Sequence, residues 1–306
     1  MNIKKLNLEF NLVKFPVIFP IIYGFVLYTL PQFETILIFV TILLLAETHF
    51  GATWPFFLNK SNSSLIKKNK IYFISIPIVI IIFSILGFLY IKPTFLLIFF
   101  AANMYHVTRQ SFGICKLYSS KINEINFQEI FIYIFNFLFF LVGFFRFYFP
   151  IIETQHLISL NIFILLFILL TVVFFIYKFK STENVYTFIT GLIIFYPICF
   201  VGNPVHSIIM GVTMHYTQYL YLTHKVYKGR SSNDTAQRSI INYLGMIIFY
   251  SIIMSLLSLF GKSSSEIFSQ LIIIPIIGQM LHFYLDSQLW KFSNPHNREN
   301  VLAYLK

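Results

Sequence analysis

The chain contains few charged residues, and this scarcity is its most informative feature. Only 11% of its 306 residues are charged, whereas 58% are hydrophobic and 20% are aromatic. A soluble globular domain carries about 25% charged residues. The composition therefore indicates an integral membrane protein before any motif is considered.

Cysteine is scarce as well. Cys115 and Cys199 lie in separate apolar segments, and the chain has no CxxC motif. This pattern excludes a disulfide framework and argues against a cysteine-ligated metal. The net charge of +11 comes from basic residues in short loops between apolar runs. Membrane orientation explains that placement better than nucleic-acid binding, so we expect no nucleic-acid partner.

Long apolar runs make up most of the sequence. A spanning helix needs about 20 mostly apolar residues, and ten segments approach that length. Short turn-like connections join them, with no long linker and no clear repeat. We predict an all-α polytopic integral membrane helical bundle and a single transmembrane domain over 1–306. The predicted spans are 15–31, 33–58, 71–91, 94–116, 128–149, 156–177, 185–202, 204–225, 239–260 and 266–290.

The basic residues predict how these spans are oriented. With a cytoplasmic N-terminus, eighteen Lys and Arg residues fall on the inside and only Lys92, Arg146 and Lys262 on the outside. This strong positive-inside bias predicts that both termini are cytoplasmic. Lys4 and Lys5 precede an apolar run without a small-residue cleavage site, so we interpret that run as a retained helix. We expect the protein in a bacterial inner (plasma) membrane.

Four histidines fall at one predicted depth. His49, His106, His215 and His282 precede the first lysine of the following loop by 11, 10, 10 and 9 residues. At about 1.5 Å per residue, each imidazole lies roughly 14–16 Å from its cytoplasmic anchor. A single intramembrane histidine is often only a hydrogen-bond partner between helices. Four at matched depth favour a shared metal site, because neutral imidazole is a common ligand of zinc and iron.

Polar side chains accompany these histidines at helical spacing. Arg109 and Gln110 follow His106 by three and four residues, Gln218 and Tyr219 follow His215 in the same way, and Asp286 follows His282 by four. Spacings of three and four residues share a helix face. Glu47 lies two residues from His49, so an ideal helix directs it elsewhere unless Gly51 loosens the helix.

The remaining histidines and two methionines are weaker candidates. We expect His156 and His206 near the opposite membrane face, and His224 and His296 at the cytoplasmic surface. Each is better explained as a solvated or interfacial residue than as a metal ligand. Met210 and Met214 are better explained by packing than by copper binding.

Four motifs surround the four histidines, in the order "ETHFGATW", "YHVTRQSFG", "MHYTQYLYLTHK" and "LHFYLDSQLWKFSNPH". Their order resembles the Brp/Blh family of membrane-embedded β-carotene 15,15'-dioxygenases. The last helix of that family shows a His, an Asp four residues later and an aromatic-basic pair, which match His282, Asp286, Trp290 and Lys291. The resemblance implies a non-haem Fe2+ site with His49, His106, His215 and His282 as ligands, and it implies retinal formation from β-carotene.

The leading functional hypothesis is therefore an iron-dependent oxygenase. Its partners would be dioxygen, membrane lipids and an apolar substrate from the bilayer, such as an isoprenoid. Asp286 would orient His282 or serve as a fifth ligand. Arg109 would bind an anionic group or pair with an acidic residue, while Gln218 and Tyr219 would complete the polar face beside His215.

Three other hypotheses stay open at this point. The same polar cluster suits a proton- or metal-coupled transporter, in which "IPIIGQ" would break the last helix. A histidine pair could instead ligate haem, or the protein could be a structural membrane protein. The HxxxH and HxxHH boxes of membrane desaturases and hydroxylases are absent from the sequence.

Overall fold

A computed structural model of the chain describes residues 8–57, 60–119, 121–181, 184–230, 236–261 and 269–305. Every regular element among these residues is helical, which confirms the all-α prediction. Lys4, Lys5, Lys262 and Lys306, which contributed to the predicted orientation, lie outside the described residues.

The α-helices vary widely in length. They are α2 (Ile18–Thr29), α3 (Glu34–Thr41), α4 (Glu47–Gly51), α5 (Trp54–Phe57), α6 (Lys60–Lys68), α7 (Ile76–Tyr90), α8 (Lys92–Tyr118), α9 (Ile122–Gly143), α10 (Thr154–Phe179), α11 (Val185–Ile193), α12 (Pro204–Arg230), α13 (Ala236–Phe260), α15 (Ile273–Leu289) and α16 (Pro295–Asn300).

Shorter helical turns of other types extend or connect them. The π-helical segments are η1 (Phe10–Lys14), η3 (Ile42–Ala46), η4 (Ile71–Ser75) and η5 (Phe144–Tyr148). The 3₁₀ segments are η2 (Pro31–Phe33), η6 (Tyr196–Cys199), η7 (Gln270–Ile272) and η8 (Leu302–Tyr304).

Five helical stretches are long and apolar enough to cross a membrane. They are Pro31–Phe57, Ile71–Tyr90, Ile122–Tyr148, Gln155–Phe179 and Ile240–Phe260. Large apolar side chains on them are exposed, for example Ile158, Phe163 and Leu170 at 65–68%. A continuous apolar surface of this kind requires lipid rather than water around it. The protein is therefore a membrane protein.

The other predicted spans depart from this simple pattern. Ile18–Thr29 and Val185–Cys199 are apolar but shorter. Helices α8 and α12 have 27 residues each, yet their polar side chains lower their hydropathy. The count of ten spans and the orientation of the termini stay predictions.

The chain folds into two compact units. Unit 1 comprises residues 1–38 and 104–218, and unit 2 comprises residues 39–103 and 219–306. Each unit thus combines two separate stretches of sequence, and α8 and α12 each carry the chain from one unit into the other. The prediction of one domain over the whole chain is not tested by this division.

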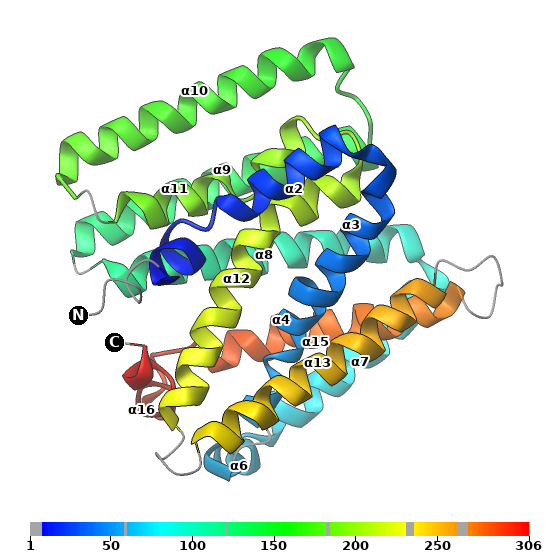
Figure 1. Cartoon of the computed structure of the whole chain (residues 1–306), viewed down its shortest axis with the longest axis vertical. Helices are drawn as coiled ribbons and strands as arrows, with labels where there is room; N and C mark the ends of the chain where they lie inside the picture. The colour runs from blue at the N-terminus through cyan, green and yellow to red at the C-terminus, as the bar shows by residue number, and fades with distance from the viewer. Residues whose placement is uncertain are drawn as a thin grey trace. The chain divides into compact units, whose positions relative to one another are not determined.

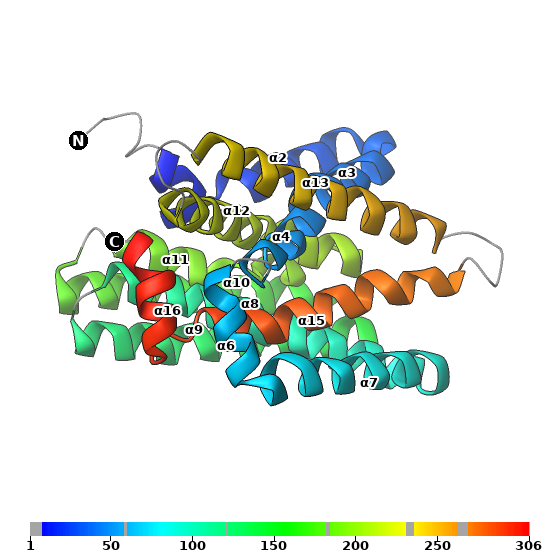
Figure 2. The ribbon, with the colours of Figure 1, turned by 90° about the horizontal axis from the view of Figure 1, so that it is seen from below.

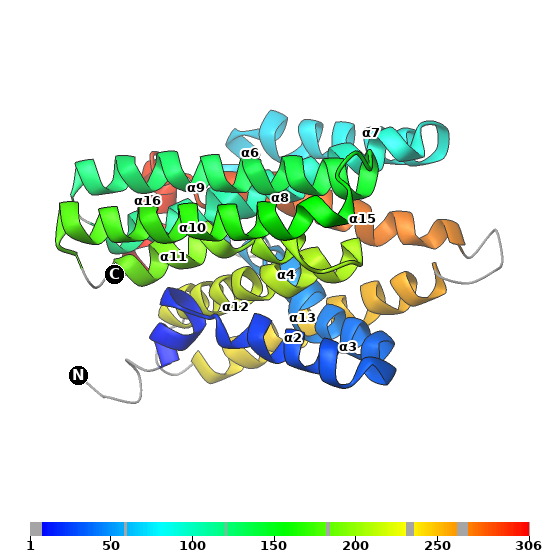
Figure 3. The same ribbon diagram turned by 90° about the horizontal axis from the view of Figure 1, so that it is seen from above.

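In unit 1, α9, α10 and α11 lie side by side (Figure 3). Their contact is aromatic, because the ring of Phe175 lies 4.7 Å from that of Phe188 and 5.9 Å from that of Phe127. Aromatic ring pairs with centroids about 4.5–7 Å apart stabilise a helix interface beyond the area that they bury.

In unit 2, α13 packs against α4 (Figure 1), and α7 runs beside α15 (Figure 2). Phe88, Phe95 and Ile276 form a buried cluster there. Gly87 makes room for this cluster, since a Cβ atom at that position would lie 2.7 Å from the Phe95 ring.

A glycine also sets the closest backbone approach in unit 1. A Cβ atom on Gly211 of α12 would lie 1.8 Å from the carbonyl oxygen of Ile194, at the end of α11. Backbone cannot yield as a flexible side chain can, so only glycine fits this crossing.

We predict that Gly211→Ala destabilises the protein by about 1–3 kcal/mol or more, the usual range for overpacking. Gly113→Ala is the matched control, because Gly113 lies in α8 with open space around its Cβ position. That control should be neutral or stabilising by about 0.5–1 kcal/mol. Thermal unfolding in detergent compares the two variants. Equal melting temperatures would contradict the predicted close approach.

Candidate metal centre

His49 is presented by an irregular stretch of helix. The π-helical segment η3 (Ile42–Ala46) leads directly into α4, which contains Glu47 and His49. A π-helical turn inserts an extra residue and rotates the residues after it, and such turns are frequent at functional sites. Both side chains end up buried, with 1% and 0% exposure, although they lie only two residues apart.

Three rings from separate helices pack together in unit 2. The ring centroids of His49 and His282 lie 4.4 Å apart, and that of Tyr219 lies 4.5 Å from His49 and 5.4 Å from His282. All three residues are at most 2% exposed. Helices α4, α15 and the second half of α12 therefore converge on one buried point.

Glycines and one tyrosine hold two of these helices in place. The ring of Tyr250 fits against Gly51 of α4, where a Cβ atom would lie 2.9 Å away. Its hydroxyl reaches Gly278 of α15, where a Cβ atom would lie 2.5 Å away. A single tyrosine on α13 therefore fills space that two glycines leave open, and this packing fixes the helices that present His49 and His282.

A chain of hydrogen bonds orients His282. Its Nδ1 atom lies 2.7 Å from Thr53 Oγ1, which lies 2.8 Å from the Tyr219 hydroxyl. Tyr219 donates in turn to Asp286 Oδ1 at 2.6 Å. Trp290 Nε1 donates to the same carboxylate oxygen, also at 2.6 Å.

The donor and acceptor of each of these hydrogen bonds can be assigned by starting from Asp286. The Tyr219 hydroxyl donates its proton to Asp286 Oδ1, which is the acceptor of this pair. The Tyr219 oxygen can then accept from Thr53, and Thr53 from the Nδ1–H of His282. This assignment places the lone pair of His282 on Nε2, the nitrogen that would ligate a metal.

Asp286 was predicted to act directly on His282, four residues earlier. The structure connects the two through the hydroxyls of Thr53 and Tyr219. Thr53 lies in the turn between α4 and α5 and was not among the predicted site residues. Only its position inside the "ETHFGATW" motif could have indicated it.

In unit 1, His106 and His215 are neighbours. Their ring centroids are 5.4 Å apart and the rings are almost perpendicular, at 88°. His106 is 7% exposed and His215 is 0% exposed. All four predicted ligands are thus buried side chains.

The four predicted ligands thus form two pairs of buried imidazoles, His49 with His282 in unit 2 and His106 with His215 in unit 1. The donors that each pair offers to a metal are imidazole nitrogens. Buried neutral imidazoles suit zinc, iron and copper. The role of His215 as a fourth ligand and the identity of the metal stay predictions.

The other predicted site residues have varied surroundings. Glu47 accepts a hydrogen bond from Gln279 at 3.3 Å. Gln218 donates to the carbonyl of Val13 at 2.8 Å, a contact that ties α12 to η1. Arg109 is exposed. The hydrogen bonds described above therefore link two of the predicted polar residues, Tyr219 and Asp286, to His282 through Thr53.

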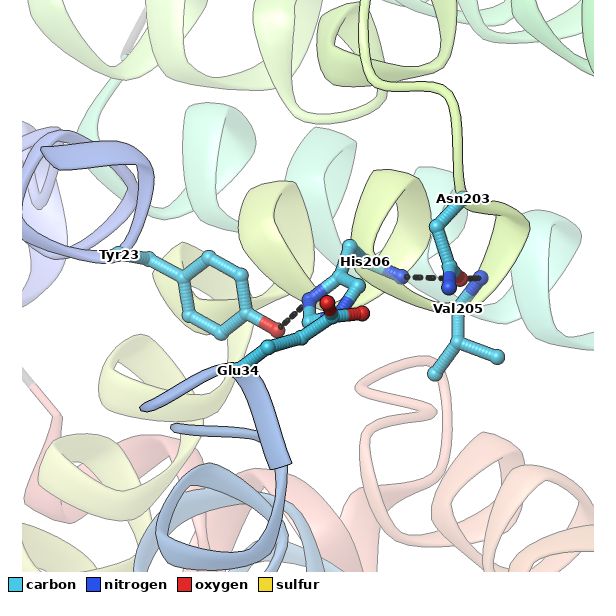
Figure 4. Close-up of polar contacts among 5 residues, drawn as sticks. All are labelled: Tyr23, Glu34, Asn203, Val205 and His206. Atoms are coloured by element: carbon cyan, nitrogen blue, oxygen red, sulfur yellow. Dashed lines mark hydrogen bonds and ion pairs between the residues drawn. The ribbon is translucent and has the colours of Figure 1, made fainter. Parts of the chain in front are cut away.

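His206 shows how a structural histidine differs from these. It is 1% exposed rather than solvated, and both ring nitrogens have partners (Figure 4). Nδ1 lies 2.7 Å from the Tyr23 hydroxyl, and Nε2 lies 2.7 Å from Glu34 Oε1. With both nitrogens engaged, His206 has no lone pair for a metal, in agreement with its exclusion from the predicted ligands.

Comparisons of the chain with protein-family models, with curated proteins and with solved structures found no match.

We predict that Tyr219→Phe lowers the free energy of unfolding by about 1–3 kcal/mol, because a buried carboxylate and the Thr53 hydroxyl each lose a partner. Tyr177→Phe, at a site 81% exposed on α10, is the control and should have no effect. Denaturant unfolding in mixed micelles measures both. A Tyr219→Phe variant as stable as the control would show that the chain of hydrogen bonds contributes nothing.

Proposed function

We propose that the protein is a membrane-embedded, histidine-ligated non-haem iron oxygenase that acts on an apolar isoprenoid or lipid. The observation that carries the proposal is the pair of buried histidines in each unit, His49 with His282 and His106 with His215, supported by the hydrogen bonds that link His282 to Asp286. His49, His106 and His282 would hold the metal, with His215 as the fourth ligand.

The residues of the site fit such a metal. Their donors are imidazoles, which suit ferrous iron with open coordination positions, and iron supplies the reaction with dioxygen. Thr53, Tyr219 and Asp286 fix the tautomer and orientation of His282, as carboxylate-linked hydrogen bonds commonly do for metal ligands. The complete burial of His49 and His282 excludes bulk water from the ligand nitrogens.

The substrate class follows from the surroundings of the site. The candidate ligands lie in helices of a membrane protein whose exposed surface is apolar, so a molecule dissolved in the bilayer is the natural substrate. β-Carotene, cleaved to retinal, is the specific case that the motif resemblance adds. The physical argument by itself requires only a long apolar molecule.

Removal of a ligand should remove the metal. We predict that His49→Ala, His106→Ala and His282→Ala each lower the iron content of anaerobically purified protein at least tenfold, while the helical content is kept. His156→Ala is the control, since that side chain is 71% exposed beside Glu153. Iron content is measured by elemental analysis. Equal iron in all four variants would reduce the cluster to a packing role.

The substrate is tested in cells that make β-carotene, supplied with iron and dioxygen. We predict that retinal accumulates with the wild-type chain and not with His106→Ala. Intact carotene beside a newly oxygenated lipid would keep the oxygenase and reject this substrate. Bound iron without oxygen consumption would reject the oxygenase in favour of transport or haem binding. Substrate flux into liposomes would then identify a transporter, and an absorption spectrum would identify haem.

A further inference from the structure

Polar residues recur along one face of each of three neighbouring helices in unit 1. On α8 and the residue after it they are spaced four apart. On α9 they are spaced four and then eight apart, with Ile132 between, and these spacings keep them on one helix face. The residues on α8 and α9 are at most 8% exposed. The polar seam, as we call this set, comprises Ser111, Cys115 and Ser119, then Glu124, Gln128 and Asn136, then Asn184, Thr187 and Gly191.

The three faces meet inside unit 1. Gly191 of α11 is the crossing point, because a Cβ atom there would lie 2.9 Å from Ile132 of α9 and 3.6 Å from Ser111 of α8. Asn136 donates to the carbonyl of Gly191 at 3.2 Å. The Thr187 hydroxyl lies within hydrogen-bonding reach of the Cys115 thiol.

A second hydrogen bond joins α9 to α11 near the connection between α8 and α9. Asn184, just before α11, donates to Oε1 of Glu124 in the first turn of α9 at 2.5 Å, and Glu124 is only 1% exposed. From Glu124 to Asn136 the seam is about 18 Å long, at about 1.5 Å per residue. It therefore runs from one end of α9 deep into the apolar part of the unit.

Several polar atoms of the seam have no hydrogen-bond partner among the described residues. Gln128 is 0% exposed, and both its amide oxygen and its amide nitrogen are buried without a partner. The same holds for the hydroxyls of Ser111 and Ser119 and for the amide oxygen of Asn136. Each such atom costs about 1–3 kcal/mol when it stays unsatisfied.

Helix packing alone does not explain this pattern. Small residues such as Gly191 and Ser111 do favour close helix contacts in membranes. A leucine in place of Gln128, however, would fill a similar volume without burying two unpaired polar groups. A water molecule both donates and accepts, and buried waters typically bind to otherwise unsatisfied polar groups of this kind.

We propose that the polar seam binds a short file of water molecules and admits water and protons from the membrane surface at the α8–α9 connection to the level of Asn136. Ser119 and Gln128 bind the outer part of the file, and Ser111 and Asn136 bind the inner part. The inference rests on unit 1 alone and does not depend on the proposed oxygenase.

The chain carries its own probe of this path, because Cys115 lies between Ser111 and Ser119. In a Cys199→Ala background Cys115 is the remaining thiol, since the sequence has two cysteines. Its S–H stretch is followed by infrared spectroscopy after reconstituted protein is transferred into D2O. A thiol reached by water exchanges its proton, whereas a thiol sealed in apolar packing does not.

We expect the Cys115 thiol to exchange at least tenfold faster than a thiol placed by Val172→Cys in a chain lacking both native cysteines. Val172 is a buried residue in the apolar face of α10, 9% exposed. Gln128→Leu should slow the exchange of Cys115 at least tenfold, with Ser111→Ala as a second variant should the first fail to fold. Exchange of Cys115 no faster than at Val172→Cys, or unaffected by these substitutions, would overturn the proposal.

Discussion

The buried carboxylate of Asp286 imposes the constraint on which the candidate site depends. Asp286 is 1% exposed in a unit of a membrane protein, where water cannot supply hydrogen bonds. Its oxygen receives donors from Tyr219 and Trp290, which lie on α12 and just after α15. Because a buried carboxyl group without hydrogen-bond donors is costly, these segments must keep the arrangement that the structure shows.

The hydrogen bonds to Asp286 also decide which nitrogen of His282 carries the proton. Tyr219 donates to the carboxylate, so its oxygen is left to accept from Thr53, and Thr53 is then left to accept from His282. One carboxyl oxygen thus decides the tautomer of an imidazole that lies two hydroxyl groups away. His206 differs from His282 because both of its ring nitrogens have partners, the Tyr23 hydroxyl at Nδ1 and the Glu34 carboxylate at Nε2.

The sequence by itself determined the class of the fold and the candidate ligands. Low charge and long apolar runs require helices in a membrane, because only internally satisfied backbones cross lipid. Matched spacing to the following lysines singled out His49, His106, His215 and His282, and each of them is buried. These conclusions depend on local periodicity, which a single helix expresses without reference to its neighbours.

Tertiary structure decided how those residues are connected. Thr53, Tyr219 and Asp286 come from three distant segments, so no spacing along the chain could predict their hydrogen bonds. Glu47 and His49 point to different faces of α4, and both are buried because α13 and α15 pack against that helix, which a spacing of two residues cannot reveal. Helices α8 and α12 carry polar residues because they pack against other helices, and hydropathy along one helix cannot reveal which neighbour will satisfy them.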